Sequence, residues 1–173
     1  MLGKKITVMP IPHIHEHTEY VKAGALTIGV EYRVLNDQIS NAYLSTVRPG
    51  TTRTERPGIA DGGVSIHVFA EEQGKLVEYL RFDAFDKEPH YHYIYPAERT
   101  QVRVILDPAA EGDLMQWILG RLRHRIPQML ESEGAAELAR RADAQAIAAA
   151  MPQVERAVQR ALSGGRPMKV ATA

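Results

Sequence analysis

The stretch YLRFDAFDKEPHYHYIYP, residues 79–96, carries the clearest structural pattern in the sequence. Two runs rich in Tyr, Phe, Leu and Ile flank the turn residues Asp86-Lys87-Glu88-Pro89, and such runs separated by turn-forming residues are typical of antiparallel strands. Pro96 closes the second run, because a proline cannot donate to a strand ladder. We therefore predict a hairpin whose strands cover residues 76–85 and 91–95.

Similar runs recur on both sides of this hairpin and predict a sheet over the N-terminal two-thirds of the chain. Gln73-Gly74 separates one such run from the hairpin, as a tight turn would. Residues 48–63 hold four glycines and two prolines with little apolar content, which predicts a long surface loop. The further strands are expected at residues 6–9, 25–35, 64–70 and 101–106.

The pattern becomes helical after Asp107, which together with Pro108 forms a typical helix start. Apolar residues then recur at helical spacing, and Pro127 is expected to kink or divide the helix because it lacks a backbone donor. An alanine-rich helix is predicted over residues 135–150. Pro152 is expected to begin the last helix.

The length and composition are those of one domain, because 173 residues with 45% hydrophobic content can build a full core. We expect residues 1–107 to be strand-rich, residues 108–165 to be helical and residues 166–173 to form a tail. The predicted fold class is α+β, with an antiparallel β-sheet or a barrel-like set of strands packed against the C-terminal helices.

The composition also argues against several classes of function and location. The sequence has no cysteine, which excludes disulfides and thiolate sites and fits a reducing compartment. Lysine plus arginine equals aspartate plus glutamate at 21 each, which argues against nucleic acid or an anionic membrane as a partner. The sequence shows no secretory signal and no apolar run of about 20 residues, so we expect a soluble cytoplasmic protein.

Five of the seven histidines fall in two short segments, HIHEH at residues 13–17 and PHYHY at residues 89–93. Alternate residues of an extended chain point to one face, so His90 and His92 can bind a single ion. Imidazole is a ligand for zinc, iron, nickel and manganese. A divalent transition metal is therefore a candidate cofactor.

The first segment and a carboxylate could complete this metal site. At most two histidines of the first segment could share the ion, because three alternate residues span too great a distance. These further candidates are His13, His15 and His17. Asp83 faces His92 in one register of the hairpin, whereas a shift of one residue pairs it with Tyr91 and turns it to the opposite side. A histidine pair with a carboxylate allows metal-assisted hydrolysis or oxygen chemistry.

The same residues also support two interpretations without a metal. Asp83 with either histidine could act as an acid/base pair, so the candidate catalytic residues are Arg81, Asp83, His90 and His92. Alternatively, the histidines fill a half-buried sheet face, and Arg81 forms an ion pair with Asp83 or Asp86.

The stretch at residues 79–96 resembles the YLRFDxFxxxPHYHY-like segment of an uncharacterised bacterial domain family of unknown function. The resemblance covers about a tenth of the chain and implies no particular activity. The cupin pattern fits poorly, because five residues separate His92 from Glu98 where that pattern has three or four.

Two hypotheses for function follow. The first is a binding or structural module that self-associates as a homodimer through the alanine-rich residues 135–150. The second is a metal-dependent enzyme that acts on a small molecule at His90 and His92, and it requires a concave pocket that contains both histidines and a carboxylate. The basic segment RLRHR, residues 121–125, favours a solvated helix face over a phosphate site. No P-loop, dinucleotide fingerprint or nucleophile elbow is present.

Overall fold

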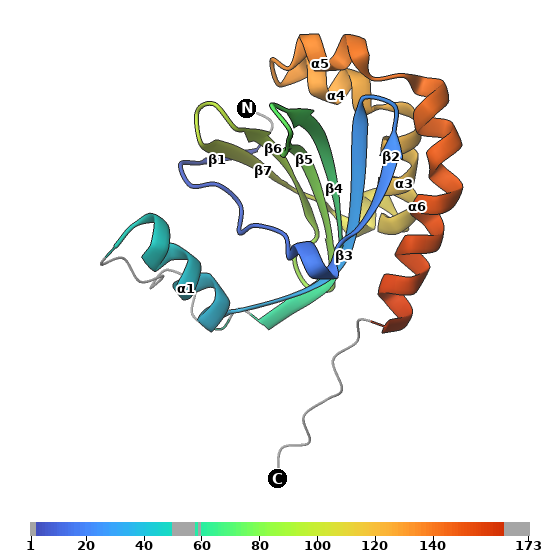
Figure 1. The fold of residues 1–173 in the computed structure, drawn as a ribbon. Helices are drawn as coiled ribbons and strands as arrows, with labels where there is room; N and C mark the ends of the chain where they lie inside the picture. The colour runs from blue at the N-terminus through green and yellow to red at the C-terminus, as the bar shows by residue number, and fades with distance from the viewer. Residues whose placement is uncertain (1–2, 50–57, 59, 165–173) are drawn as a thin grey trace.

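A computed structural model describes residues 3–49, 58 and 60–164 of the chain. Seven strands form one antiparallel sheet in the order β1-β7-β6-β5-β4-β3-β2 (Figure 1). They are β1 (Lys4–Ile6), β2 (Glu19–Ala23), β3 (Leu26–Asn36), β4 (Ala60–Glu72), β5 (Lys75–Phe85), β6 (His90–Tyr95) and β7 (Thr100–Ile105). The α+β class with an antiparallel sheet is confirmed. The described sheet is open, with β1 and β2 at its edges, and not barrel-like.

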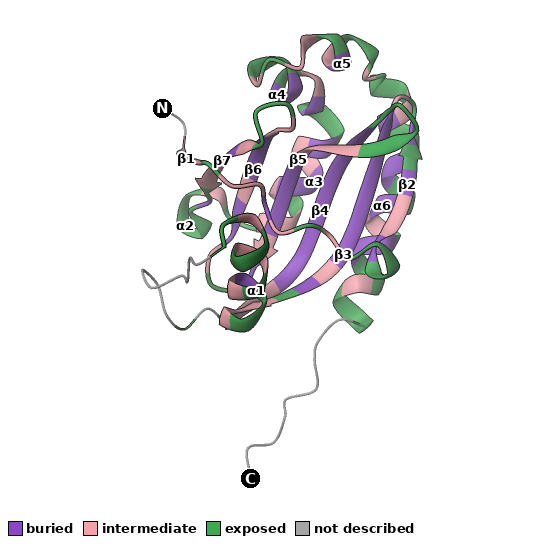
Figure 2. Cartoon of the chain, turned by 60° about the vertical axis from the view of Figure 1, so that its left-hand side comes forward, coloured by how far each residue is buried: buried purple, intermediate pink, exposed green. Residues whose placement is uncertain are grey.

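The helices are η1 (His15–His17, a 3-10 turn), α1 (Asp37–Val47), α2 (Pro108–Glu111), α3 (Leu114–His124), α4 (Ile126–Ser132), α5 (Ala136–Arg141) and α6 (Ala144–Gly164). α3 and α6 cover one face of the sheet, whereas α1 and the N-terminal segment lie on the opposite side (Figures 1 and 2). The C-terminal helices therefore pack against the sheet as predicted.

The hydrophobic core lies between the sheet and the C-terminal helices. Three side chains are fully buried there: Ile66 of β4, and Leu80 and Phe82 of β5. They share one face of the sheet because alternate residues of a strand point to the same side. α6 adds a stripe at helical spacing, formed by Ile147, Met151, Val154 and Val158. Each such side chain contributes roughly 1.5–3 kcal/mol when fully buried.

The helix starts were predicted with mixed success. Asp107 caps α2 with its side chain and Pro108 occupies the first turn, as predicted. α2 has only four residues, and a second capping residue, Asp113, begins α3. Pro127 lies in the first turn of α4, so the chain divides just before it, as predicted.

Pro152 lies inside α6 and does not begin a helix, so that prediction is wrong. The interruption in the alanine-rich region falls earlier, where Asp143 accepts a hydrogen bond from the Gln145 amide at 2.8 Å. Pro152 is exposed and lies between the buried residues Met151 and Val154. A proline inside a helix costs about 3 kcal/mol, and burial of the apolar stripe on both sides offsets this cost.

The N-terminal half contains two elements that the sequence interpretation missed. α1 follows β3 directly, and Asn36 caps it by accepting a hydrogen bond from the Ile39 amide at 2.8 Å. β2 pairs with β3 across a tight turn at Gly24, where φ is 64°. That positive φ favours glycine, which makes the turn possible.

Two predicted boundaries also differ from the structure. The first strand lies at Lys4–Ile6 and not at residues 6–9, since the following chain contains prolines that cannot donate to a ladder. β4 begins at Ala60, inside the predicted loop at residues 48–63. Residues 50–57 and 59 of that predicted loop lie outside the described part of the chain.

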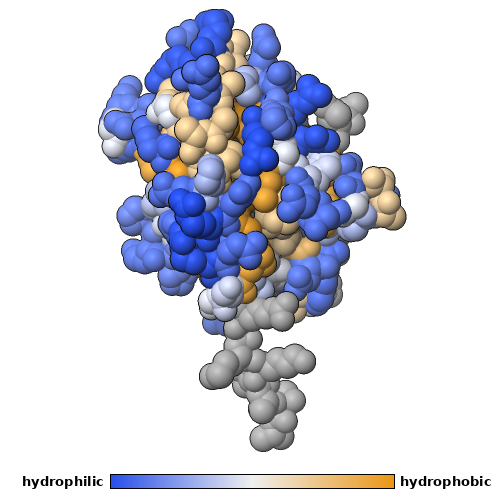
Figure 3. Space-filling view, turned by 90° about the vertical axis from the view of Figure 1, so that its right-hand side faces the viewer, coloured by the Kyte–Doolittle hydropathy of each residue, from blue (hydrophilic) through white to orange (hydrophobic). Residues whose placement is uncertain are grey.

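The alanine-rich residues 135–150 pack against the rest of the chain. Leu138, Ile147 and Ala150 belong to its hydrophobic core. The side of the molecule that carries α6 is hydrophilic around its margins, with apolar patches between them (Figure 3). Part of this segment's apolar surface is therefore buried within the chain itself, and the homodimer stays a prediction. Within the described residues, no helix combines the length and apolarity needed to cross a membrane.

Candidate metal centre

The face of the sheet that points away from α3 and α6 carries buried polar side chains. They come from β3 to β7 and are Glu31, Arg33, Ser65, His67, Arg81, Asp83, His90, His92 and Gln101. The N-terminal segment crosses this polar face (Figure 2). Between them lies a cavity of about 500 Å³, lined in part by residues 4–11, Arg33, Asp83, His90 and His92.

The hairpin register places Asp83 and both histidines on the same face. Asp83 is directly opposite His90, and Arg81 is directly opposite His92. The register is therefore neither of the two considered from the sequence. The observed register is shifted by two residues from the register that pairs Asp83 with His92. A shift of two residues keeps every side chain on its face of the sheet, so Asp83 still lies on the same face as the histidines.

The three side chains converge on a single carboxylate oxygen. Asp83 Oδ2 lies 3.0 Å from His92 Nε2 and 3.3 Å from His90 Nε2. One potential ligand atom from each residue lies within 4.8 Å of the others, and all three residues are buried. The two imidazole rings are 4.7 Å apart at their centroids and nearly perpendicular.

Neighbouring groups fix the orientation of two of these side chains. Ser65 Oγ donates a hydrogen bond to the other oxygen of Asp83, Oδ1. His90 Nδ1 lies 2.6 Å from the carbonyl oxygen of Glu88, which can only accept, so Nδ1 carries a proton. His92 Nδ1 is buried and has no hydrogen-bond partner among the described residues.

The protonation states suit ligand chemistry. Burial lowers the pKa of His92 to about 4, despite its hydrogen bond to Asp83, so the ring is neutral near pH 7. Burial alone would raise the pKa of Asp83, but the hydrogen bonds from His90 and His92 hold it well below its usual range. A neutral imidazole and an ionised carboxylate are the forms that bind metals.

Arg81 is held by Glu78 and not by Asp83 or Asp86. Its Nε and Nη2 donate to the two carboxylate oxygens of Glu78 at 2.8 and 2.7 Å, and Nη1 donates to the carbonyl oxygen of Ile11 at 2.8 Å. Burial alone would raise the pKa of Glu78, but the Arg81 charge and the contacts with His67 hold it far below its usual range.

The sequence interpretation missed Glu78 because residues three apart on a regular strand face opposite sides. Val68 pairs with Leu80 and Phe69 pairs with Glu78, which leaves Tyr79 as an extra residue in β5. This bulge brings Glu78 to the same face as Arg81. No turn or proline marks the bulge in the sequence, so a strict two-residue period could not reveal it.

A second arginine shares the carbonyl oxygen that Arg81 uses. Arg33 Nη2 donates to the carbonyl oxygens of Ile11 at 3.1 Å and Pro12 at 3.2 Å. Arg33 Nη1 also lies 3.4 Å from Glu31 Oε1. The two guanidinium groups thus meet at Ile11 and fasten the N-terminal segment across the polar face.

The histidines of the first segment lie apart from the Asp83 cluster. His15 and His17 are exposed in η1. His13 Nε2 and His15 Nδ1 each lie 2.8 Å from the Tyr20 hydroxyl oxygen, and the His13 ring is 5.5 Å from His67. Among the described residues, the potential metal ligands that converge are Asp83, His90 and His92. The histidines of the first segment are not part of this group.

The fold and the site together define an α+β protein whose open antiparallel sheet carries a buried Asp-His-His cluster beside a cavity. The chain belongs to the family described as "Domain of unknown function (DUF7700)", whose model matches residues 20–158. The expected membership of an uncharacterised family is thereby confirmed. No match was found among curated proteins or among solved structures.

Proposed function

We propose that the protein binds a divalent transition metal through Asp83, His90 and His92 and acts on a small molecule in the adjoining cavity. Of the two hypotheses drawn from the sequence, this one required a concave pocket with both histidines and a carboxylate. The observation that carries the proposal is the convergence of Nε2 of both histidines on Oδ2 of Asp83, at 3.0 and 3.3 Å.

These separations match those of atoms that share one metal ion. Two ligand atoms bonded at about 2.1 Å to one tetrahedral or octahedral ion lie roughly 3.0–3.4 Å apart. Ordinary hydrogen bonding also explains the 3.0 Å contact of His92, whereas the 3.3 Å contact of His90 is longer than a usual N–H···O hydrogen bond.

The proton on His90 Nδ1 bears on this contact. Since Nδ1 donates to the Glu88 carbonyl oxygen, the 3.3 Å contact between His90 Nε2 and Asp83 Oδ2 is favourable only when Nε2 carries a second proton or when both atoms bind one cation. Two acceptor atoms at that distance repel each other unless a positive charge lies with them. A metal ion bound to both atoms would supply that charge, as would a second proton on the ring, and the Glu88 carbonyl is the kind of partner that orients metal-binding histidines.

Two imidazoles and one carboxylate leave coordination positions open for water or a substrate, and a metal held this way acts as a Lewis acid or activates water. The cavity beside them has a volume of about 500 Å³, which lies within the usual range for small-molecule sites. Its lining includes apolar residues such as Ile6, Met9 and Phe85 as well as arginines, so it can bind an organic molecule with a polar group.

The test is the metal content of untagged protein by mass spectrometry. Wild type is compared with Asp83→Asn, His90→Ala and His92→Ala, and with His17→Ala as a matched control at an exposed histidine. We expect close to one transition-metal ion per chain in wild type and in the control. Each of the three site variants should retain less than about a tenth of it, since losing one of three ligands weakens binding strongly.

Circular dichroism of each variant separates loss of the metal from loss of the fold. The proposal is wrong if wild type takes up no zinc, iron, nickel or manganese when each is offered. Equal metal content in the folded His90→Ala and His92→Ala variants would also contradict it, and would favour Asp83 with His90 as a metal-free acid/base pair.

A further inference from the structure

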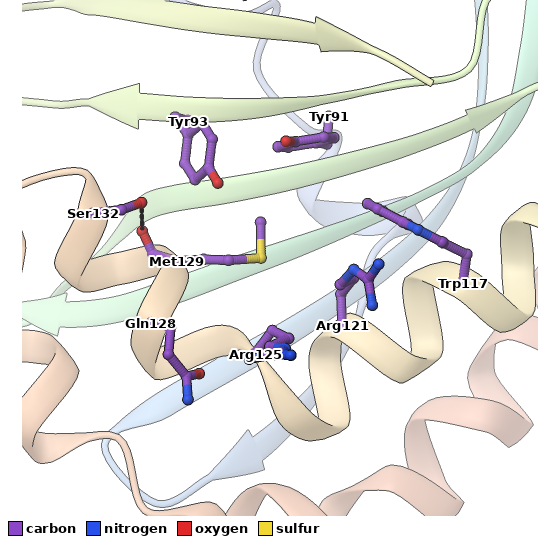
Figure 4. Close-up of a pocket in the computed structure, with 8 residues that line it drawn as sticks. All are labelled: Tyr91, Tyr93, Trp117, Arg121, Arg125, Gln128, Met129 and Ser132. Carbon is purple, nitrogen blue, oxygen red and sulfur yellow. Dashed lines mark hydrogen bonds between the residues drawn. The ribbon is translucent and has the colours of Figure 1, made fainter. Parts of the chain in front are cut away.

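A second cavity lies on the other side of the sheet, between β6 and the helices α3 and α4, and has a volume of about 360 Å³. Figure 4 shows the side chains that converge on it from one strand and two helices. They are Tyr91, Tyr93, Trp117, Arg121, Arg125, Gln128, Met129 and Ser132. This volume lies within the range of small-molecule sites.

One part of the cavity wall is aromatic. The Tyr91 ring lies 5.3 Å from Tyr93 and 5.9 Å from Trp117, measured between ring centroids. The two tyrosines share a face because they alternate along β6, and Trp117 comes from the facing helix. Rings at such separations stack edge-to-face or offset, so a planar ligand ring can join them.

The other part of the wall is cationic. The Arg121 guanidinium lies 4.4 Å from the centre of the Trp117 ring, and Arg125 lies one helical turn further along. Within residues 3–49, 58 and 60–164, neither arginine has a carboxylate oxygen within the 4.0 Å that defines an ion pair, whereas Arg123 has Glu155. No acidic side chain lines the cavity.

The hydroxyl of Tyr91 can add a hydrogen-bond donor to this wall. Burial, the neighbouring Tyr93 and the charges of Glu111 and Glu133 raise its pKa, so the hydroxyl stays protonated at neutral pH. Glu111 and Glu133 lie near Tyr91, but neither carboxylate lies within the 4.0 Å ion-pair distance of Arg121 or Arg125.

The helix dipole alone does not account for this arrangement. Basic residues are favourable at the C-terminal end of α3, where Arg121, Arg123 and His124 lie. The interaction of a basic residue with the helix dipole does not require its side chain to point in a particular direction. Arg123 turns outward to Glu155 at 2.6 Å, whereas Arg121 and Arg125 line the cavity with the aromatic rings.

We infer that this cavity binds a planar aromatic carboxylate of one or two rings, with the ring against Tyr91 and Trp117 and the carboxylate on Arg121 and Arg125. The size agrees, because a closed cavity of about 150 Å³ already holds benzene. Arginine forms paired, charge-assisted hydrogen bonds with a carboxylate, which fixes the orientation of the ring. The site lies on the opposite side of the sheet from Asp83 and does not depend on the proposed metal.

Trp117 is the single tryptophan of the sequence, so its fluorescence reports on this cavity directly. The experiment titrates the full-length protein with sodium benzoate, and with benzyl alcohol and sodium acetate as a neutral ring and a ringless anion. We expect a saturable change in emission with benzoate and at least tenfold weaker binding of the two other probes. The same result is expected with and without EDTA, which separates it from the metal site.

Variants then assign the contact. Arg125→Gln and the double variant Arg121→Gln/Arg125→Gln should weaken benzoate binding by about tenfold or more, in line with the loss of charge-assisted hydrogen bonds. Arg123→Gln, on the same helix, should bind benzoate like wild type. Arg125 is exposed, so its replacement leaves the fold intact. The inference is wrong if benzoate shows no saturation, if benzyl alcohol binds as tightly, or if both arginine variants bind unchanged.

Discussion

The two faces of one sheet are buried by different means in this protein. On the face toward α3 and α6, side chains such as Ile66 and Phe82 are buried by apolar contact. On the other face, Arg81 and Asp83 are buried to a similar extent by hydrogen bonds and ion pairs. Successive residues of β5 thus alternate between two kinds of core.

This difference teaches that burial alone does not identify a structural core. Phe82 is completely buried and Asp83 is only 3% exposed, although they are neighbours in the sequence. Apolar contacts tolerate replacement by residues of similar volume, whereas a buried charge needs a particular partner. The polar face is therefore the one whose residues are set by chemistry.

Phe82→Ala should give the largest loss of stability. The side chain is fully buried among the helix-facing residues, so its removal leaves a cavity and loses transfer free energy. We expect the free energy of unfolding to fall by roughly 3–5 kcal/mol in urea denaturation followed by circular dichroism. A loss below about 1 kcal/mol would mean that this face is loosely packed and would remove the contrast between the two faces.

Arg81→Met should be nearly as damaging, for a different reason. It leaves the carboxylate of Glu78 without its paired donors in a buried site, which costs about 3 kcal/mol. The double variant Arg81→Met/Glu78→Met should recover part of that loss, because the unpaired carboxylate is gone, although His67 Nδ1, 2.6 Å from Glu78 Oε1 in the wild type, also loses its partner. Urea denaturation of the three proteins measures the coupling, and additive effects would show that the pair is not coupled.

A smaller effect is expected from pH. His92 has a pKa of about 4 in the folded protein and 6.5 as its ordinary value, so between these values the unfolded chain binds more protons. The free energy of unfolding should therefore decrease as the pH falls from 6.5 toward 4, by on the order of 2 kcal/mol in total. Asp83, whose pKa is also lowered, acts in the same direction at still lower pH.

Urea denaturation at pH 7, 6, 5 and 4 in the presence of EDTA measures this dependence. His92→Gln lacks the titrating ring, so its stability should change less across the same range. The two curves running parallel would show that His92 protonates equally in the folded and unfolded states, and that its burial does not govern its charge.

The sequence revealed the hairpin at residues 76–95, the cap at Asp107 and the dividing proline because these features act locally. Asp107, Pro108 and Pro127 constrain only their own turn, so they have the same effect in most contexts. The alternation in β5 and β6 left two faces open for Asp83, and the observed register, which is neither of the two considered, puts it on the face of the histidines.

What the sequence could not reveal depends on tertiary packing. The bulge at Tyr79 is set by the pairing of β4 with β5, and only this pairing brings Glu78 to Arg81. Pro152 lies inside a helix because the apolar stripe on both sides of it faces the sheet. The first histidine segment shares its spacing with the second, but the turn η1 directs it toward Tyr20.

The carbonyl oxygen of Ile11 has a consequence for the speed of exchange at the proposed metal site. Residues 4–11 form part of the cavity wall, and Arg33 and Arg81 both hold Ile11 by hydrogen bonds. A molecule that enters or leaves past this segment has to wait for both bonds to open together. Along that route, residence times should be governed by the opening rate of a short stretch of backbone, and not by the strength of the contacts that the molecule makes.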